Sequence, residues 1–334
     1  MEYRCLGRSS LKVSALCLGC MNFGRSTEED EAVRIIHAAI DEGINFIDTA
    51  NVYARGTSEA IVGKALAGGR RDKVVLATKA SNPMGDGPND QGSSRYHIMK
   101  QVEDSLERLK TDHIDLYQLH FMDLETPLEE SLRTLDDLVR QGKIRYVGVS
   151  KWAPAWTVEA LMLCDRHGWT RIVCEQPPYN LLDRRIEDEL IWTCMRHGIG
   201  IIPWAPIGGG VLSGKYQKGK KLPPGSRFRQ MGSRLNDECI DRADALKPLA
   251  AEKGVTLAEF CLAWVLRQPG ITAPIIGVRT MEHLISALKS LDVVFTEEDY
   301  ARIDEIAPPG SAVADYWDVN VYRRCRKAAG IIRE

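Results

Sequence analysis

Short apolar runs alternate with longer amphipathic segments along most of this chain. The short runs are rich in Val, Ile and Leu, which is typical of parallel strands buried on both faces. The longer segments repeat apolar residues at helical spacing, and several end in a glycine that suits a helix C-cap. The expected strands are Ala15–Leu18, Asn45–Asp48, Val74–Thr78, Ile114–Leu119, Ile144–Ser150, Ile172–Gln176, Ile199–Trp204 and Ala273–Ile276.

Helices are expected between and after these strands. Repeated strand–helix units predict parallel β-α-β crossovers. Eight such units favour a closed (β/α)8 TIM barrel over an open sheet, and we expect one barrel domain over residues 1–334. The expected helices are Thr27–Glu42, Ser58–Ala67, Ser94–Leu109, Pro127–Gln141, Pro154–His167, Ile186–His197, Asp237–Lys253 and Met281–Leu288.

Four segments lie outside the eight-fold pattern. Tyr3–Leu6 and Leu11–Ser14 predict an N-terminal β-hairpin, and Thr256–Arg267 predicts an extra helix before the eighth strand. Ala205–Asn236 is a long loop rich in Gly and Pro, and loops that follow barrel strands build the active site. Residues 309–334 form a separate C-terminal tail, whose basic run at 323–327 suits a solvated helix face better than a partner site.

Charge and composition exclude several classes of function. The 334 residues include 44 Lys and Arg and 46 Asp and Glu, so nothing favours binding to nucleic acid or an anionic membrane. No run of ~18 apolar residues spans a bilayer, and the N-terminal segment has no apolar signal region. Nine scattered cysteines suit reduced thiols better than a disulfide framework. We therefore expect a cytoplasmic protein.

Polar residues end several of the expected strands. Asp48 ends the second strand and Tyr53 follows it, while Lys79 and His120 end the third and fourth. A barrel delivers such strand ends to one mouth, so these four residues make a proton-transfer constellation. A Lys ammonium beside a Tyr favours the phenolate and lowers the pKa of the phenol, which makes Tyr a better proton donor. The Asp would hold the Lys charged, and the His would hydrogen-bond a substrate oxygen.

Several motifs give this chain a close resemblance to the aldo-keto reductase superfamily, in the branch that contains potassium-channel β subunits and bacterial NADPH-dependent reductases. The resemblance covers nearly the whole chain. The motifs lie at Asn45–Tyr53, Ala77–Lys79, Ser105–His120, Gly142–Ser150, Gln176–Asp183 and Pro203–Tyr216.

The resemblance implies a catalytic tetrad of Asp48, Tyr53, Lys79 and His120, with Tyr53 as the general acid. It also implies a (β/α)8 barrel that reduces an aldehyde or ketone to an alcohol. NADPH is the preferred cofactor and NADH the alternative. The substrate-binding residues that it implies are Tyr53, His120, Phe23 and Trp152.

The same resemblance implies where the cofactor binds. Trp204 would stack on the nicotinamide, Ser150 and Gln176 would bind its carboxamide, and the glycine-rich loop would cover the pyrophosphate. The family usually has Asn where this chain has Lys151, and a basic residue there resembles the potassium-channel branch. The full set of expected cofactor contacts is Met21, Asp48, Ser150, Lys151, Gln176, Trp204, Ala205, Pro206, Ile207, Gly208, Gly210, Leu212, Gly214, Lys215, Arg227, Gly277, Arg279 and His283.

Arg279 is the reason to prefer NADPH. It follows the eighth strand, where the family binds the adenosine 2′-phosphate, and a guanidinium suits a phosphate because it donates two hydrogen bonds and carries a fixed charge. Arg227 would add a second cation. Ser286 and Ala287 stand where the family often has Glu-Asn, which predicts a weakened adenine contact.

Three other motifs point elsewhere and are less well supported. Tyr96 and Lys100 match the pair of short-chain dehydrogenases, but the chain lacks the G-x-G-x-x-G turn of a Rossmann fold. Gly209–Lys215 fits a P-loop, but the next residue is Tyr216 rather than Ser or Thr. Cys17 and Cys20 have redox or zinc spacing, but small residues at a strand end explain them as well. The histidines show no metal-ligand spacing, so we expect no catalytic metal.

One alternative function stays open. A regulatory or scaffold subunit would keep the barrel and the cofactor but show little turnover. The expected partner of the enzyme is a small carbonyl compound, and an assembly of identical subunits is compatible with the sequence. Met21, Phe23, Trp152 and the loop at 80–94 are expected to shape the pocket, which suits sugars, polyketide-like ketones or xenobiotic aldehydes equally.

Overall fold

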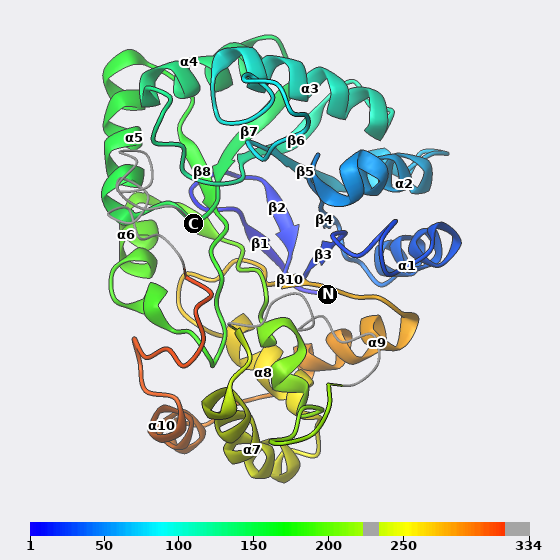
Figure 1. The fold of residues 1–334 in the computed structure, drawn as a ribbon, viewed down its shortest axis with the longest axis vertical. Coiled ribbons are helices and arrows are strands. Elements are labelled where there is room, and N and C mark those ends of the chain that lie inside the picture. The colour runs from blue at the N-terminus through cyan, green and yellow to red at the C-terminus, as the bar shows by residue number, and fades with distance from the viewer. Residues whose placement is uncertain (223–233, 318–334) are drawn as a thin grey trace.

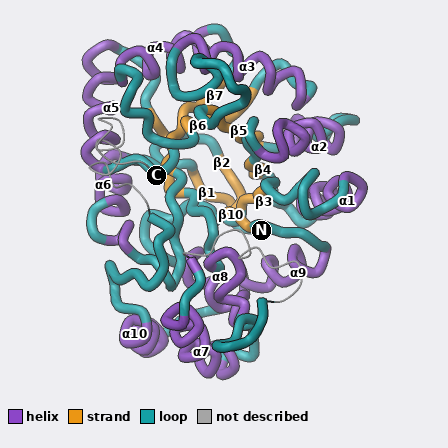
Figure 2. Tube along the Cα trace, in the orientation of Figure 1, coloured by secondary structure: helices purple, strands orange, loops and turns teal. Residues whose placement is uncertain are grey.

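Eight parallel strands form the centre of the molecule (Figures 1 and 2). The structure is a computed structural model that describes residues 1–222 and 234–317. The strand order is β10-β3-β4-β5-β6-β7-β8-β9, as expected for consecutive β-α-β units. The strands are β3 (Cys17–Gly19), β4 (Phe46–Asp48), β5 (Val75–Ala80), β6 (Ile114–Leu119), β7 (Ile144–Val149), β8 (Ile172–Glu175), β9 (Gly200–Ile201) and β10 (Ile275–Ile276).

The sheet closes into the expected (β/α)8 barrel. The amide of Thr272 donates to the carbonyl of Ile201 at 2.8 Å, and the amide of Ile275 donates to that of Pro203 at 2.8 Å. These bonds join the chain before and within β10 to the chain at β9. The barrel is thus sealed although its last two strands are short.

The expected hairpin lies against the barrel. Its strands are β1 (Tyr3–Cys5) and β2 (Lys12–Ser14), which pair antiparallel. Leu6 and Val13 from the hairpin are fully buried against Cys17, Phe46 and other residues of the barrel interior. The hairpin therefore covers the end of the barrel at which the strands begin.

Helices surround the strands (Figure 2). Seven of the eight expected helices agree with the structure to within about two residues, the usual uncertainty of helix ends. The expected extra helix is α8, whereas α10 was not expected from the sequence. The helices are α1 (Glu29–Asp41), α2 (Thr57–Ala65), α3 (Arg95–Leu109), α4 (Leu128–Arg140), α5 (Pro154–His167), α6 (Leu190–His197), α7 (Asp237–Glu252), α8 (Leu257–Leu266), α9 (Met281–Lys289) and α10 (Glu297–Ile306).

The expectation of one helix over Ile186–His197 was wrong. The structure has a short 3-10 helix at Arg185–Glu187, and α6 begins only at Leu190. Arg184 explains the break, because its guanidinium binds Glu187 at 2.6 Å and Asp304 of α10 at 2.6 Å. This tertiary ion-pair network holds the first turn apart from the rest of the helix.

Successive side chains of each strand point to opposite faces of the sheet, so the barrel interior and the layer between strands and helices form two separate hydrophobic cores. In β5, Val75 and Ala77 face the barrel interior, whereas Leu76 packs with the helices. The same period of two then directs Lys79 into the barrel. The side chains that point inward near the ends of the strands are polar. They meet at the open end of the barrel.

Candidate active site

Lys79 links two of the expected catalytic residues. Its Nζ lies 2.5 Å from Oδ1 of Asp48 and 3.3 Å from the hydroxyl oxygen of Tyr53. Lys79 is fully buried, and its third partner is the carbonyl of Thr49 at 2.7 Å. Burial opposes the charge on Lys79, but Asp48 and Tyr53 outweigh that cost and raise its pKa. Lys79 is therefore an ammonium at neutral pH and donates to the phenol oxygen.

Asp48 is held by amide side chains as well as by Lys79. Gln118 and Gln176 each donate to its Oδ2 at 3.0 Å, and Gln176 also donates to Oε1 of Gln118. These bonds fix the orientation of the carboxylate. Our sequence reasoning missed Gln118. The sequence feature that could have identified Gln118 is its position two residues before His120, because this spacing puts both side chains on one face of the strand.

His120 completes the group. Its ring lies edge-on to that of Tyr53, with centroids 5.7 Å apart. Burial lowers the pKa of His120 well below its ordinary value, and the charges of Lys79 and Lys151 lower it further. The imidazole is therefore neutral at neutral pH. Its Nδ1 is buried and has no hydrogen-bond partner among the described residues.

The turn that carries Tyr53 has an unusual backbone. Ala54 and Arg55 have φ values of 49° and 54°, and Gly56 follows with φ 91°. Behind this turn, Arg108 donates to Glu59 at 2.7 Å and packs so closely that a Cβ on Gly56 would meet its Cδ at 2.7 Å. Two consecutive left-handed residues without glycine persist only where surrounding contacts enforce them. The tertiary structure thus sets the position of Tyr53.

The expected nicotinamide side of the site lies across the barrel mouth. Ser150 donates its hydroxyl to the carbonyl of Gln176 at 2.7 Å. Trp204 follows β9 and is partly exposed. Lys151 has φ 55°, and its charge lowers the pKa of His120. These residues come from three adjacent segments after β7, β8 and β9.

A cationic cluster lies at the opposite side of the expected cofactor site. Burial lowers the pKa of Lys215, and the nearby charge of Arg279 lowers it further. Burial and the charges of Arg279 and Lys215 likewise lower the pKa of His283. Such mutual repulsion is relieved by a bound anion. This donor set fits a phosphate of a dinucleotide.

Two further features lie beside the cluster of Lys215, Arg279 and His283. Gly208, Gly209 and Gly210 all have positive φ, and a Cβ on Gly210 would come within 3.3 Å of Nζ of Lys215. Asn22, which our sequence reasoning missed, donates to the carbonyls of Gly277 and Val278 and so fixes the backbone before Arg279. No sequence signal identified Asn22. The remaining cofactor contacts expected from the sequence belong to the segments already described in this section. The exception is Arg227, which is outside the described residues.

Two expected substrate contacts do not line an open surface. Phe23 is 0% exposed and Trp152 is 1% exposed, and the Trp152 ring packs edge-on against Trp156. A fully buried ring cannot contact a substrate unless its neighbours move. Both residues follow barrel strands, but in this structure they stabilise the loops rather than the pocket.

The alternative motifs also have clear placements. Cys17 and Cys20 are fully buried, and burial raises the pKa of each thiol. Tyr96 is 66% exposed at the start of α3. Over residues 1–222 and 234–317 no group of His, Cys, Asp or Glu side chains has the arrangement of a metal site. Within the same ranges, no helix is both long and apolar enough to cross a membrane.

The fold and the site together define a (β/α)8 barrel with a hydrogen-bonded Tyr–Lys–Asp group at its mouth. Residues 15–308 match the model of the Aldo/keto reductase family, and the chain belongs to this family. It is 41% identical over 321 residues to "Uncharacterized oxidoreductase YrpG" of Bacillus subtilis, covering 93% of this chain and 97% of that protein.

Two further relatives carry different names. The chain is 38% identical over 318 residues to "Probable voltage-gated potassium channel subunit beta" of Oryza sativa, covering 92% of this chain and 96% of that protein. It is 35% identical over 337 residues to "Versiconal hemiacetal acetate reductase" of Aspergillus parasiticus, covering 91% and 96%. The similarity therefore extends both to proteins named as reductases and to one named as a channel subunit.

Proposed function

We propose that this protein is an NADPH-dependent reductase of aldehydes or ketones, built as a single catalytic domain. The observation that carries the proposal is the position of Lys79 between Asp48 and Tyr53. An ammonium that donates to a phenol oxygen stabilises the phenolate left when the phenol gives up its proton. Tyr53 is therefore equipped as a general acid.

The roles of the residues follow from their geometry. When bound, a reduced nicotinamide supplies the hydride for the carbonyl carbon. The hydroxyl of Tyr53 donates its proton to the carbonyl oxygen, which becomes the alcohol. Neutral His120 hydrogen-bonds the same oxygen and orients the substrate. Asp48 keeps Lys79 charged, and the two glutamine amides hold the Asp48 carboxylate in place.

The preference for NADPH rests on the cluster formed by two cations, Lys215 and Arg279, with the imidazole of His283 beside them. NADH has a pyrophosphate but lacks the 2′-phosphate. Lys215 follows the glycine-rich loop, Arg279 precedes α9 and His283 lies in its first turn, and these three donors exceed what a pyrophosphate alone requires. We propose that Arg279 and His283 bind the 2′-phosphate and that Lys215, beside Gly210, binds the pyrophosphate.

A turnover assay with 4-nitrobenzaldehyde and NADPH tests the proposal. Wild-type protein should oxidise NADPH, and Tyr53→Phe should lower kcat by ~10²–10⁴-fold, the usual contribution of a general acid. NADPH should still quench the protein fluorescence of Tyr53→Phe, because the hydroxyl serves the reaction rather than binding. Near-normal turnover in a folded Tyr53→Phe protein would reject Tyr53 as the acid.

A second candidate function comes from the relative named as a channel subunit. Such a protein would bind the cofactor and act mainly through a partner. The same assay separates the two functions, because a scaffold should bind NADPH tightly but consume little of it with any member of an aldehyde and ketone panel.

A further inference from the structure

A short C-terminal segment crosses the loop that we assign to the cofactor. We call residues 311–317 the C-terminal strap. They lie beyond the family match, which ends at residue 308. The amides of Val313 and Ala314 both donate to the carbonyl of Leu182, at 2.9 and 3.3 Å. The strap is therefore hydrogen-bonded to the segment that follows β8.

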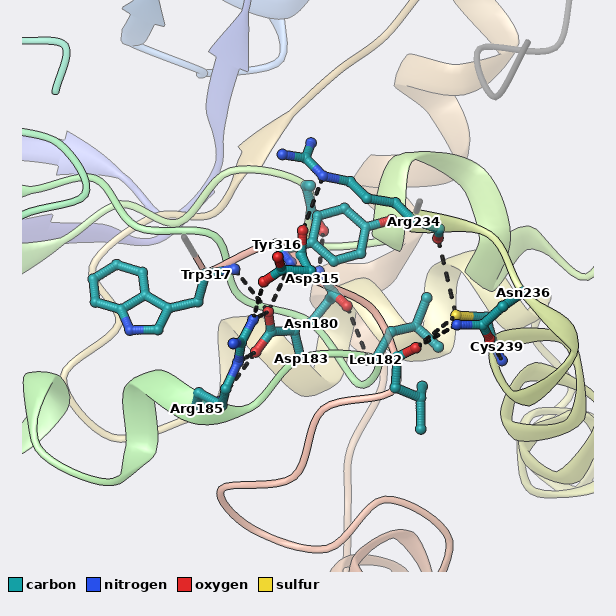
Figure 3. Close-up of polar contacts among 12 residues, drawn as sticks. Asn180, Leu182, Asp183, Arg185, Arg234, Asn236, Cys239, Asp315, Tyr316 and Trp317 are labelled. Atoms are coloured by element: carbon teal, nitrogen blue, oxygen red, sulfur yellow. Dashed lines mark hydrogen bonds and ion pairs between the residues drawn. The ribbon is translucent and has the colours of Figure 1, made fainter. Parts of the chain in front are cut away.

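Asp183 anchors the strap (Figure 3). Its Oδ2 accepts from the amides of Tyr316 and Trp317 at 2.9 and 2.7 Å, and it is 1% exposed. Arg185 binds both oxygens of Asp183 and also Asp315 at 2.8 Å. The buried carboxylate is therefore paired with a cation and fully hydrogen-bonded. Such a charge fixes backbone position, because breaking either interaction leaves it uncompensated.

Tyr316 connects this anchor to the cofactor loop. Its hydroxyl donates to the carbonyl of Gly208 at 2.7 Å, and the side chain is 1% exposed. Its ring lies 6.2 Å from that of Trp204 in an edge-on arrangement. The guanidinium of Arg234 lies 5.5 Å from the Trp204 ring and 5.1 Å from the Tyr316 ring, and its Nε donates to the carbonyl of Asp315.

The loop at 205–214 requires such support. Ala205, Gly208, Gly209, Gly210 and Gly214 all have positive φ. Glycine loses more conformational freedom than any other residue when it is fixed, and Ala205 is strained in this region. Contacts from outside the segment lower this conformational freedom. Tyr316 supplies a contact at the first of the three consecutive glycines.

We infer that the C-terminal strap is a positioning element for the cofactor loop, and that Tyr316 holds Gly208 in the conformation that receives the dinucleotide. This inference rests on the proposed function. The physical basis is preorganisation: a loop that is ordered before binding loses less conformational entropy when the ligand binds. Tyr316 and Asp183 act through the loop and are positioning residues rather than catalytic ones.

The first test is Tyr316→Phe, which removes one hydroxyl and keeps the buried ring. We expect the Kd for NADPH, measured by fluorescence quenching, to rise about 3- to 10-fold, the size of one neutral hydrogen bond. Tyr3→Phe is the matched control. Tyr3 also donates to a glycine carbonyl, that of Gly43 at 3.0 Å, but from the hairpin at the other end of the barrel. Its Kd should equal that of the wild type.

The second test needs no cofactor. Hydrogen exchange of the amides at 205–214 should be faster in Tyr316→Phe than in the wild type, and unchanged in Tyr3→Phe. Asp183→Asn should accelerate exchange at 205–214 and at 312–317 together, because it loosens the anchor itself. If Asp183→Asn does not fold, Tyr316→Phe still decides the question.

The outcomes separate this inference from the proposed function. Unchanged exchange at 205–214 in folded Tyr316→Phe would overturn the inference, and so would faster exchange with an unchanged Kd. Wild-type protein that binds neither NADPH nor NADH would overturn the proposed function instead. The exchange comparison would then still decide whether Tyr316 orders this loop.

Discussion

In this site the protonation states of Lys79 and His120 are set by the residues around them. Lys79 stays protonated because Asp48 and Tyr53 offset its burial, whereas His120 stays neutral because burial and two nearby ammonium groups act in the same direction. Lys79 is thus charged, whereas the imidazole of His120 is not. The two residues therefore have different roles: Lys79 supplies a fixed positive charge, and His120 supplies a neutral hydrogen-bonding group.

Arg279→Ala should distinguish the two cofactors. The lost charge-assisted hydrogen bond is worth roughly 1.5–3 kcal/mol, so the Kd for NADPH should rise about ten- to a hundredfold. The Kd for NADH should change much less, since NADH has no 2′-phosphate. Direct binding titrations with both cofactors check this. Equal losses would place Arg279 at the pyrophosphate or in a structural role.

His120 should make stability depend on pH in the acid range. Its pKa is below the ordinary value in the folded state and returns to ~6.5 on unfolding. Between these values the unfolded state binds the extra proton, so the free energy of unfolding falls as pH drops below ~6.5, by at most about 1.4 kcal/mol per pH unit.

Urea unfolding at a series of pH values measures this effect. His120→Gln should show a smaller loss of stability between pH 7 and pH 5. His97 and His283 also have lowered pKa values and remain in both proteins, so the difference isolates His120. Parallel curves for the wild type and the variant would contradict the prediction.

At the scale of the elements, strand packing sets the geometry of the tetrad. Gly148 of β7 lies opposite Gln118 of β6, and a Cβ there would meet Cγ of Gln118 at 2.9 Å and Cβ of Cys174 at 3.3 Å. The absence of a side chain on β7 therefore makes room for the amide that binds Asp48.

Gly148→Ala should disturb both stability and catalysis. Overpacking of a tight interior costs typically about 1–3 kcal/mol, and displacement of Gln118 should lower kcat more than it changes the Kd for NADPH. Urea unfolding and turnover kinetics measure the two effects. Gly277→Ala is the stability control, because its added methyl has its nearest atom at 3.8 Å. A wild-type kcat in Gly148→Ala would show that the Gln118 bond is dispensable.

For the whole molecule, the N-terminal hairpin completes the barrel interior. The hairpin residues Leu6 and Val13 are fully buried with inward residues of the strands. Gly7 lies so close to β9 that a Cβ would meet the nitrogen of Gly200 at 2.6 Å. The barrel and the hairpin therefore share one core, and damage to the hairpin should destabilise the whole fold.

Leu6→Ala should lower the free energy of unfolding by about 2–5 kcal/mol, the usual loss when a fully buried Leu is truncated. Leu11→Ala is the control, because Leu11 is only partly buried in the same hairpin and should lose less. Urea denaturation followed by circular dichroism measures both. A loss for Leu6→Ala of well under ~2 kcal/mol would contradict the shared core.

The sequence by itself determined the barrel, the order of its elements and the convergence of Asp48, Lys79 and His120. Local rules suffice for this, because hydrophobic periodicity specifies strands and helices, and parallel strand ends must meet at one mouth. It also specified the N-terminal hairpin and the extra helix α8. These are features that neighbouring residues along the chain encode.

Only the tertiary structure decided how distant segments act on the site. Gln118 binds Asp48 across 70 residues, Asn22 holds the backbone before Arg279 across 255, and Tyr316 reaches Gly208 across 108. The break before α6 and the burial of Phe23 and Trp152 likewise depend on contacts between remote segments. No periodicity records such pairings, because each depends on how the closed barrel brings distant segments together.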